Sequence, residues 1–535
     1  MIRVATNRTT TFGLGLLALL FLVASVRLVQ QRREERSPGR ETVRFVHTHL
    51  EAGVREGFDE VARAYEALHP GVVVEQIAVP NRTYAMWLET KLTGRLTPDL
   101  VQIGVRTTAH DRGITDERVL RYFEPLGARV EEPNPYNNGT THEGLPWRET
   151  FIDGLTSSPA YQPNLLNVYG IPNTIQTRRM FINLDLLRRI TGSSATPASL
   201  GEFFALCERV HAYAGERETT LFPLAGPIPQ EEIFGAVTQR LNARIEHTLK
   251  HEITPLDVAV GYLNGDWSFE APAVRAGLRL FREIARQIPP GGNHLSREDA
   301  LFLFAQQRAL MFFTDSSDYG SIRAQVGFPV TAFRLPAPAF DDPVYGYGTL
   351  GGVTEVSAGG QLVFAVSRDS PQRERAIDFL RFLTSQRGAA MFARRSGWIS
   401  AVRDVPVPEE LRMLEPVVPG FVRGMSPVVG GETTRVFNQY LHELTGPGGG
   451  VERFVAAMRD PYERALRSDL QQGIHSVVLN SMIYDTVLGA LWWQQAHEPG
   501  TDARLSEVVE SQNFQEQISF WRRHEALRSR TDGAP

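Results

Sequence analysis

Past a basic and apolar N-terminal stretch, short apolar runs alternate with segments in which apolar residues recur every three or four positions. Residues 43–48 form an apolar run that predicts a strand, and residues 58–68 carry apolar side chains at the spacing of one helix face. The unit repeats as a strand at 72–79 and a helix at 84–92, and a third strand follows at 99–104. This order of strands and helices predicts an open α/β sheet.

The alternation continues after an aperiodic segment at 131–163, which is rich in Pro, Asn, Gly and Thr and predicts a loop. Further strands are expected at 168–172, 179–183, 309–313 and 360–367. Helices are expected at 199–212, 231–242, 273–287, 296–308 and 372–384. The C-terminal part is again helix-rich, with apolar residues at helical spacing up to Trp492. The pattern therefore predicts an α/β protein with a helical C-terminal extension.

The N-terminal segment has the layout of a targeting signal. Two arginines precede an uncharged run at 9–26, in which Val23 and Ser25 are small enough for the positions that a signal peptidase reads. Residues 9–29 are also nearly long enough to anchor the chain in a bilayer if they stay uncleaved. Four arginines after the run favour a cytoplasmic location for that side. Residues 1–41 are therefore expected to be a signal segment or a membrane anchor with its linker, and both alternatives stay open.

Charge and cysteine content narrow the classes of function. The net charge of −5 includes seven Arg against two Glu in residues 1–40, so the rest of the chain is more acidic than the total suggests. An acidic body argues against nucleic acid as a partner. Cys207 is the only cysteine, so the chain has no intramolecular disulfide, no multi-cysteine metal site and no lipid-bearing N-terminal cysteine. Its place on the apolar face of an expected helix predicts a buried structural thiol.

Six segments of the chain, taken in their order along the sequence, resemble a known protein family. They are FVHTHLEAG at 45–53, FDEVARAYEALHPGVVVE at 58–75, LTGRLTPDLVQIG at 92–104, YGIPNTIQTRRMFINLDLLRRI at 169–190, LFLFAQQRALMFFTDSSD at 301–318 and AIDFLRFLTSQRGAAMFARRSGWISA at 376–401. In this order they resemble the extracellular solute-binding proteins of ABC importers, in the sugar-binding group that includes maltose-binding protein. The resemblance covers about residues 43–465 and leaves the C-terminal tail outside the pattern.

The resemblance implies a two-lobed periplasmic-binding-protein-like fold, with a hinge and a ligand cleft between the lobes. Each lobe would be built from separate chain segments. Lobe one would comprise residues 42–170 and 314–362, lobe two residues 171–313 and 363–465, and the helical C-terminal extension residues 466–535. Hinge closure around the ligand is the expected motion.

The same resemblance implies an extracytoplasmic substrate-binding component of an ABC transporter, located in the periplasm or on the outer face of the cytoplasmic membrane. The expected partners are a small-molecule ligand, in the first place a carbohydrate, the permease subunits, and the membrane if the N-terminal segment is uncleaved. Two alternatives are a membrane-anchored solute sensor without transport and a carbohydrate-active enzyme. The chain contains no G-x-S-x-G, H-E-x-x-H, P-loop or dinucleotide motif, so we expect no enzyme and no cofactor.

A sugar presents apolar C–H faces and a ring of hydroxyls, so its site needs aromatic platforms and planar polar groups. His47, His49 and Glu51 follow the first expected strand and point to one side of it. The His-x-His-x-Glu spacing would also suit a metal, but no second cluster supports that reading, and we expect no metal. Solvated loop side chains are the remaining alternative.

The other expected ligand-binding residues follow strand ends or match cleft-facing segments of the family. They are Arg106, Asn173, Trp267, Asp315, Tyr347, Gly352, Trp398, Glu432, Arg435 and Phe437. A surface role for Arg106, a turn role for the glycine and a half-buried core position for Trp267 are the competing interpretations. We expect Asp315 to accept sugar hydroxyls and Trp398 to stack on a sugar ring.

Overall fold

The structure is a computed structural model. It describes residues 40–51, 53–105, 116–157, 159–162, 165, 167–246, 253–356 and 360–497. The N-terminal signal or anchor segment and the end of the C-terminal extension lie outside the described residues. Within the described part, no helix combines the length and the apolar character needed to cross a membrane.

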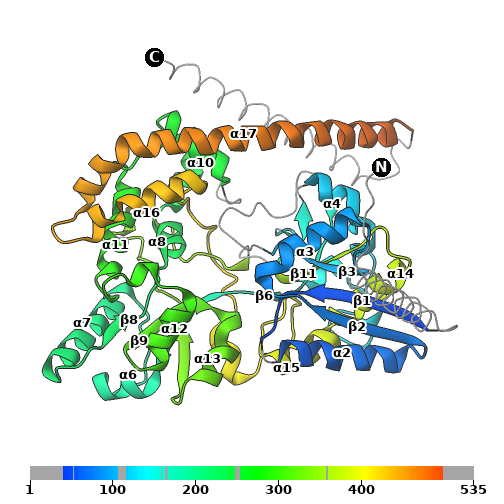
Figure 1. The fold of residues 1–535 in the computed structure, drawn as a ribbon, viewed down its shortest axis with the longest axis horizontal. Coiled ribbons are helices and arrows are strands. Elements are labelled where there is room, and N and C mark those ends of the chain that lie inside the picture. Colours follow the sequence, from blue (N-terminus) through cyan, green and yellow to red (C-terminus); the bar gives the residue numbers. More distant parts are fainter. Residues whose placement is uncertain are drawn as a thin grey trace, which may run out of the picture.

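Two α/β lobes lie side by side (Figure 1). The first contains a five-stranded sheet in the order β2 (Val72–Ala78), β1 (Glu41–His47), β3 (Leu100–Ile103), β11 (Gly360–Val366) and β6 (Ile171–Ile175). The first three strands are parallel, and β11 is antiparallel to both of its neighbours. The three N-terminal strands confirm the open α/β sheet predicted from the pattern.

Helices cover this sheet because their apolar residues recur at helical spacing and need a surface to pack against. Helix α2 packs on α15, and the contact is close because Gly57 of α2 has no side chain to separate it from Phe392. The helices of this lobe are α2 (Val54–Leu68), α3 (Asn81–Thr93), α4 (Asp116–Tyr122), α5 (Gly127–Val130), α14 (Arg373–Leu383) and α15 (Gln386–Ser396). Their buried faces and the sheet form one core.

The second lobe contains a four-stranded sheet in the order β10 (Val330–Phe333), β7 (Arg178–Asn183), β9 (Ala309–Asp315) and β8 (Phe222–Leu224). Its helices are α6 (Leu184–Thr191), α7 (Leu200–Glu216), α8 (Gln230–Val237), α9 (Gln239–Glu246), α10 (Pro255–Leu263), α11 (Pro272–Ala285), α12 (Arg297–Ala305), α13 (Tyr319–Gln325) and α16 (Gly431–Thr445). The single helix expected at 231–242 is two helices, α8 and α9. Cys207 is buried in α7, as predicted.

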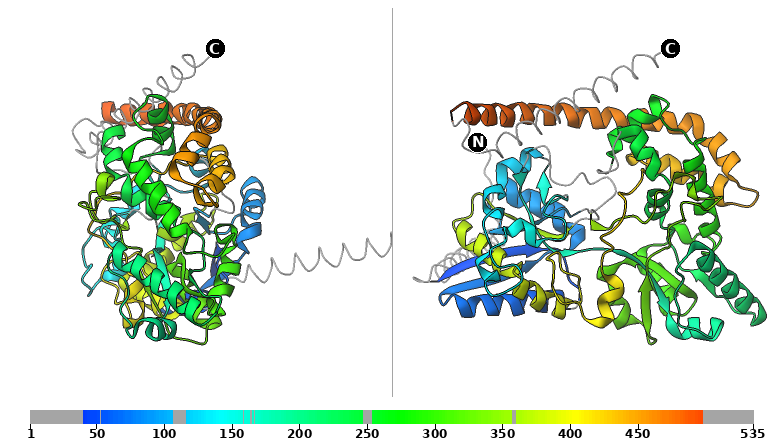
Figure 2. Two further views of the ribbon diagram at one scale, coloured as in Figure 1. Left: turned by 90° about the vertical axis from the view of Figure 1, so that its left-hand side faces the viewer. Right: turned by 180° about the vertical axis from the view of Figure 1, so that it is seen from behind.

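The chain crosses between the two sheets three times. The first crossing joins β6 to β7, the second joins β10 to β11, and the third runs from the end of α15 back to α16. In Figures 1 and 2 these segments occupy the narrow region between the lobes. Crossings of this kind form a hinge.

The expected lobe boundaries are wrong for the second half of the chain. Almost all buried residues of segment 362–405 share one core with β1–β3. Buried residues of segment 310–335 belong to two cores that contain residues of β7 and β9, and segment 425–470 shares one of these two cores. The assignment of 314–362 to lobe one and of the first part of 363–465 to lobe two is therefore inverted. The physical reason is that β11 pairs with β3 and β6, which places the helices that follow it on the first sheet.

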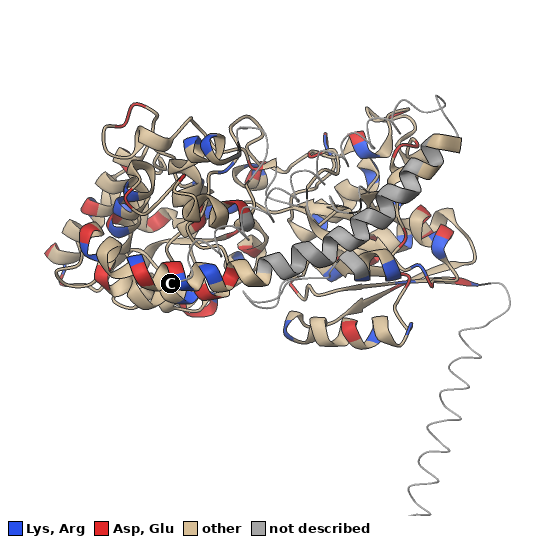
Figure 3. Ribbon diagram, turned by 90° about the horizontal axis from the view of Figure 1, so that it is seen from above, with Lys and Arg blue, Asp and Glu red and all other residues tan. Residues whose placement is uncertain are grey.

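The described part of the C-terminal extension belongs to one long helix, α17 (Val451–His497), which confirms the helical character as far as residue 497 and begins before the expected residue 466. It packs against α16 and α10 in lobe two and approaches α4 of lobe one near its other end. Figures 1 and 2 show it running over both lobes. Figure 3 shows acidic and basic residues interspersed along the ribbon of both lobes.

Candidate functional site at the hinge

A cavity of about 330 Å³ lies on the lobe-two side of the hinge. We call it the hinge pocket. Its wall combines residues of the three crossings with residues of β7, β9, α8 and α11. The lining residues are Gln176, Thr177, Arg178, Glu231, Glu232, Ile233, Gly235, Ala236, Leu280, Asp315, Arg334, Leu335, Pro336, Ala337, Pro338, Val353, Thr354, Glu355 and Arg423.

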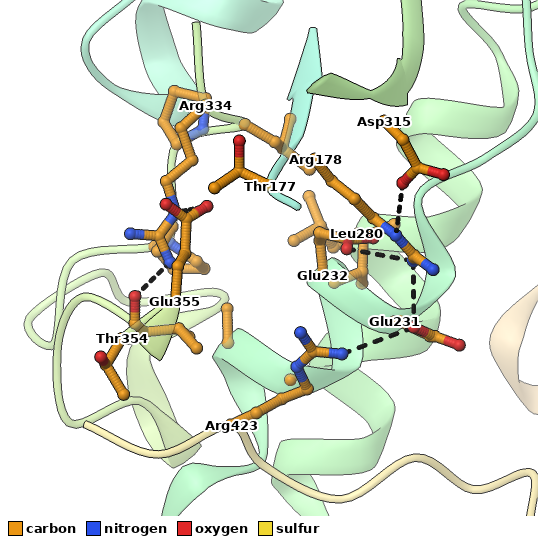
Figure 4. A pocket seen from close by; sticks show the side chains of 18 of the residues that line it. Thr177, Arg178, Glu231, Glu232, Leu280, Asp315, Arg334, Thr354, Glu355 and Arg423 are labelled. Atoms are coloured by element: carbon orange, nitrogen blue, oxygen red, sulfur yellow. Dashed lines mark hydrogen bonds and ion pairs between the residues drawn. The ribbon is translucent and has the colours of Figure 1, made fainter. Parts of the chain in front are cut away.

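One wall of the pocket is a cluster of carboxylates around Arg178, the first residue of β7 (Figure 4). Arg178 Nη1 lies 2.9 Å from Glu231 Oε2 and 3.2 Å from Glu232 Oε1, and Arg178 Nε lies 3.5 Å from Asp315 Oδ1. Although burial acts in the opposite direction, these carboxylates raise the pKa of Arg178. The guanidinium stays charged and holds the three acidic side chains together.

The opposite wall is built from the second crossing and the residue after β10 (Figure 4). Glu355 receives two hydrogen bonds from Arg179, at 2.6 and 3.0 Å, and one from the amide of Val417 at 2.8 Å. Arg334 donates to the carbonyl of Val353, and its Nε lies 3.7 Å from Glu355 Oε1. Burial lowers the pKa of Arg334 from its usual value.

Asp315 stands at the end of β9, where the polar residue that follows an apolar strand reaches the pocket. Burial raises the pKa of its carboxyl to about 6, and Arg178 partly offsets this rise. The structure places Asp315 in the hinge pocket and in a second cavity, of about 880 Å³, that adjoins it. The two cavities also share Arg178, Glu231 and Arg423.

Replacing Asp315 by asparagine is expected to change how stability depends on pH. At pH values between the ordinary pKa of an aspartate and about 6, the folded state holds a proton on Asp315 that the unfolded state lacks. The Asp315 carboxyl therefore makes the wild-type protein less stable as the pH rises through this window. The difference in melting temperature, Asp315→Asn minus wild type, should therefore grow from pH 4 to pH 7. Scans by circular dichroism would measure it, and a constant difference would contradict the raised pKa.

His49, Glu51 and Trp398 meet at the lobe-one side of the hinge. His49 Nδ1 lies 3.3 Å from Glu51 Oε2, and the rings of His49 and Trp398 pack edge to face at 4.9 Å. The indole N–H of Trp398 donates to the carbonyl of Ser317 at 3.1 Å. Trp398 is only 5% exposed, so in this arrangement it joins the lobes and offers no open face to a sugar ring.

Two predicted ligand-binding residues lie in cores, and these predictions are wrong. His47 is completely buried among Phe45 and Phe58, because the last residue of β1 still faces the helices. Trp267 is 2% exposed and donates its indole N–H to the carbonyl of Val258 at 2.7 Å. The core interpretation of Trp267 is therefore the right one.

Asn173 is the middle residue of β6, the strand that leads into the first crossing, and is 1% exposed. Neither polar atom of its side chain has a hydrogen-bond partner within the described structure. A buried amide without partners is costly in free energy. Asn173 therefore stays a candidate ligand-binding residue, although it does not line the hinge pocket.

The remaining predicted residues are scattered. Glu432 and Arg435 pair with each other at 2.9 Å and line a shallow groove between α16 and α17, so they do not join the hinge pocket. Phe437 is buried in lobe two and reaches the wall of the adjoining cavity. Tyr347 is 64% exposed, and Gly352 precedes the pocket residue Val353.

Arg106 lies outside the described residues. Among the residues that are described, no group of three or more His, Cys, Asp or Glu side chains is arranged to hold a metal ion.

Sequence reasoning missed most of the charged residues of the hinge pocket. Arg178 begins an apolar strand and is followed by Arg179, Arg334 follows another strand, and Glu231, Glu232 and Arg423 sit in helix or loop segments without a recognisable motif. A charge at the edge of an apolar strand was the available signal, and Asp315 is the residue for which it was used.

Two α/β lobes, three crossings and a polar cavity at the hinge define a solute-binding protein. A family model described as bacterial extracellular solute-binding protein matches residues 61–414. The chain belongs to this family of extracellular proteins, which places its function outside the cytoplasm.

Individual known proteins are more distant. A binding protein of Brucella abortus (strain 2308) is 24% identical over 349 residues, which are 64% of this chain and 72% of that protein. The apo-form of RafE from Streptococcus pneumoniae has 15% identity and a TM-score of 0.53, covering 80% of this chain and 98% of that one. The bacterial solute receptor AcbH, with a preference for β-D-galactopyranose, has 15% identity and a TM-score of 0.51, and the match covers 80% of this chain and 100% of that one. These likenesses support the fold.

Proposed function

We propose that this protein is the substrate-binding component of an ABC importer and captures a carbohydrate or a related polar solute. The observation that carries the proposal is the hinge pocket, which places seven charged side chains in one cavity beside three interlobe crossings. Polar groups that converge in a concave site are typical of small-molecule binding. Closure of lobe one over the pocket would complete the site and present a changed surface to a permease.

Carbohydrate is the ligand class favoured by the similarity to known proteins. The solute receptor AcbH, with its preference for β-D-galactopyranose, and a chitin oligosaccharide binding protein share this fold at TM-scores of 0.51 and 0.50. We expect the protein to bind the carbohydrate without altering it chemically. If the N-terminal segment anchors the protein, it would be held at the outer face of the cytoplasmic membrane.

Thermal stabilisation by a carbohydrate is the test of this function. A ligand that binds only the folded state should raise the unfolding free energy by about 2.7 kcal/mol at a hundred times its dissociation constant. The purified protein is scanned against a panel of neutral and acidic mono- and oligosaccharides. The bound ligand is then recovered by chromatography. Recovery of the unchanged saccharide supports a binding protein, hydrolysis products in proportion to protein identify an enzyme, and a panel without any shift contradicts the proposal.

A further inference from the structure

We propose that the ligand of the hinge pocket is an anionic carbohydrate, with its acidic group on Arg334 and its hydroxyls on Glu232 and Asp315. This inference rests on the proposed function and specifies the chemical class of the ligand. It follows from three features of the described residues that line the pocket.

The first feature is the lack of an aromatic platform. Binding sites for neutral sugars gain much of their free energy from aromatic rings stacked on C–H faces. The described residues that line the hinge pocket include no Phe, Tyr, Trp or His, and its apolar part consists of small or aliphatic side chains such as Leu280 and Pro336. Affinity in this pocket must therefore come from hydrogen bonds, and those that involve charged groups are the stronger ones.

The second feature is the charge on the Arg334 wall. Among the described residues, Glu355 is the only carboxylate within ion-pair distance of Arg334, and Arg179 already donates to both of its oxygens. Arg179 and Arg334 each carry one positive charge and Glu355 carries one negative charge, so this wall has a net charge of one positive unit. The Arg334 side chain is 29% exposed and donates to one backbone carbonyl, which leaves most of its five N–H groups for a ligand. A partly desolvated guanidinium in this state favours an anionic partner.

The third feature is the opposite wall. Glu231, Glu232 and Asp315 share Arg178, and Arg423 adds a weaker contact to Glu231 at 3.4 Å. Glu232 Oε2 is buried and has no hydrogen-bond partner within the described structure. An unpartnered carboxylate oxygen needs a donor. Hydroxyl groups of a sugar supply such donors.

The two walls therefore recognise different ends of one ligand. A carboxylate or a phosphate would complete the Arg334 wall, and a polyhydroxyl ring would satisfy the wall around Glu232. A neutral sugar could satisfy only the second wall. Uronic acids and sugar phosphates share the required chemistry, and the experiment distinguishes them.

Matched sugars test the inference on the wild-type protein. Calorimetric titrations would compare galacturonate and glucuronate, galactose and glucose, and the 6-phosphates of both hexoses. We expect the acidic sugars to bind roughly tenfold or more tightly than the neutral ones, because a hydrogen bond to a charged group stabilises more than a neutral one. Preference for the uronates identifies a carboxylate, and preference for the phosphates identifies a phosphate. Equal or stronger binding of the neutral sugars would overturn the inference and leave the proposed function standing.

Variants of Arg334 locate the effect. Arg334→Gln should reduce the affinity for the acidic sugar roughly tenfold or more and abolish the preference for acidic over neutral sugars. Arg334→Lys keeps a positive charge and should retain part of that affinity. Arg412→Gln is the matched control, because Arg412 is 63% exposed and pairs only with Glu409 in the described structure. A preference that survives Arg334→Gln would overturn the placement on Arg334. Binding of no saccharide of either kind would overturn the proposed function and this inference together.

Discussion

Replacing Arg179 by methionine is expected to lower the free energy of unfolding by about 3–5 kcal/mol. Arg179 and Glu355 form a buried ion pair whose side chains are 3% and 12% exposed. The guanidinium also donates to the carbonyls of Met413, at 2.9 Å, and Glu415, at 2.6 Å. Methionine would fill much of the volume but leave a carboxylate buried without its partner. Urea denaturation followed by circular dichroism would measure the loss.

The same ion pair connects all three crossings of the hinge. Arg179 follows the first crossing, Glu355 belongs to the second, and the two carbonyls belong to the third. The exposed pair Arg188–Asp185 in lobe two provides a control, and Arg188→Met should cost no more than about 1 kcal/mol. The double variant Arg179→Met/Glu355→Leu should recover part of the loss, since it removes the orphaned charge. Equal effects of Arg179→Met and Arg188→Met would refute the expectation.

Acidification is expected to destabilise the protein by up to about 3 kcal/mol through His47 alone, which follows from its shifted pKa. Burial lowers the pKa of His47 to about 4, partly offset by its hydrogen bond to Gln76. His47 Nε2 lies 3.1 Å from Gln76 Oε1, and Nδ1 accepts from the amide of His49 at 3.2 Å. Both ring nitrogens are thus used by the neutral ring, and a second proton would have no acceptor.

The sign follows from proton uptake. Between pH 6.5 and about 4 the unfolded state binds a proton on this histidine that the folded state does not, so stability falls as pH falls through this window. His47→Gln should remove that part of the pH dependence, whereas His442→Gln, at a side chain 69% exposed, should leave it unchanged. Unfolding free energies from urea titrations at pH 4, 5, 6 and 7 decide the matter. Parallel curves for wild type and His47→Gln would disprove the shift.

Local sequence was sufficient to predict most strands and helices of the two sheets. The strands expected at 43–48 and 179–183 appear as Glu41–His47 and Arg178–Asn183, because an apolar run that is buried on both faces has few alternatives to a central strand. The prediction of one helix at 231–242 was wrong, because the first of two helices ends at Thr238, whose hydroxyl donates to the carbonyl of Phe234.

The candidate site was predicted less well. Asp315 was singled out because it follows an expected apolar strand at a place where the resemblance implied a cleft residue, and the structure places it in the wall of the hinge pocket. His47 was also chosen because it stands at the end of an expected strand, but its side chain is completely buried. The side to which a strand-end residue points depends on the register with β2 and β3, which no local pattern contains.

The sequence by itself determined the α/β class, the helical extension and the family, because periodicity and the order of motifs are properties of a linear chain. The tertiary structure alone decided which chain segments share a lobe and which charges share a cavity. Strand β11 pairs with β3, more than 250 residues away in the sequence, and with β6, more than 180 residues away. Arg334 and Glu232 line one cavity although they belong to different elements. Such pairings depend on burial and hydrogen bonding between distant segments, and these exist only once the chain has folded.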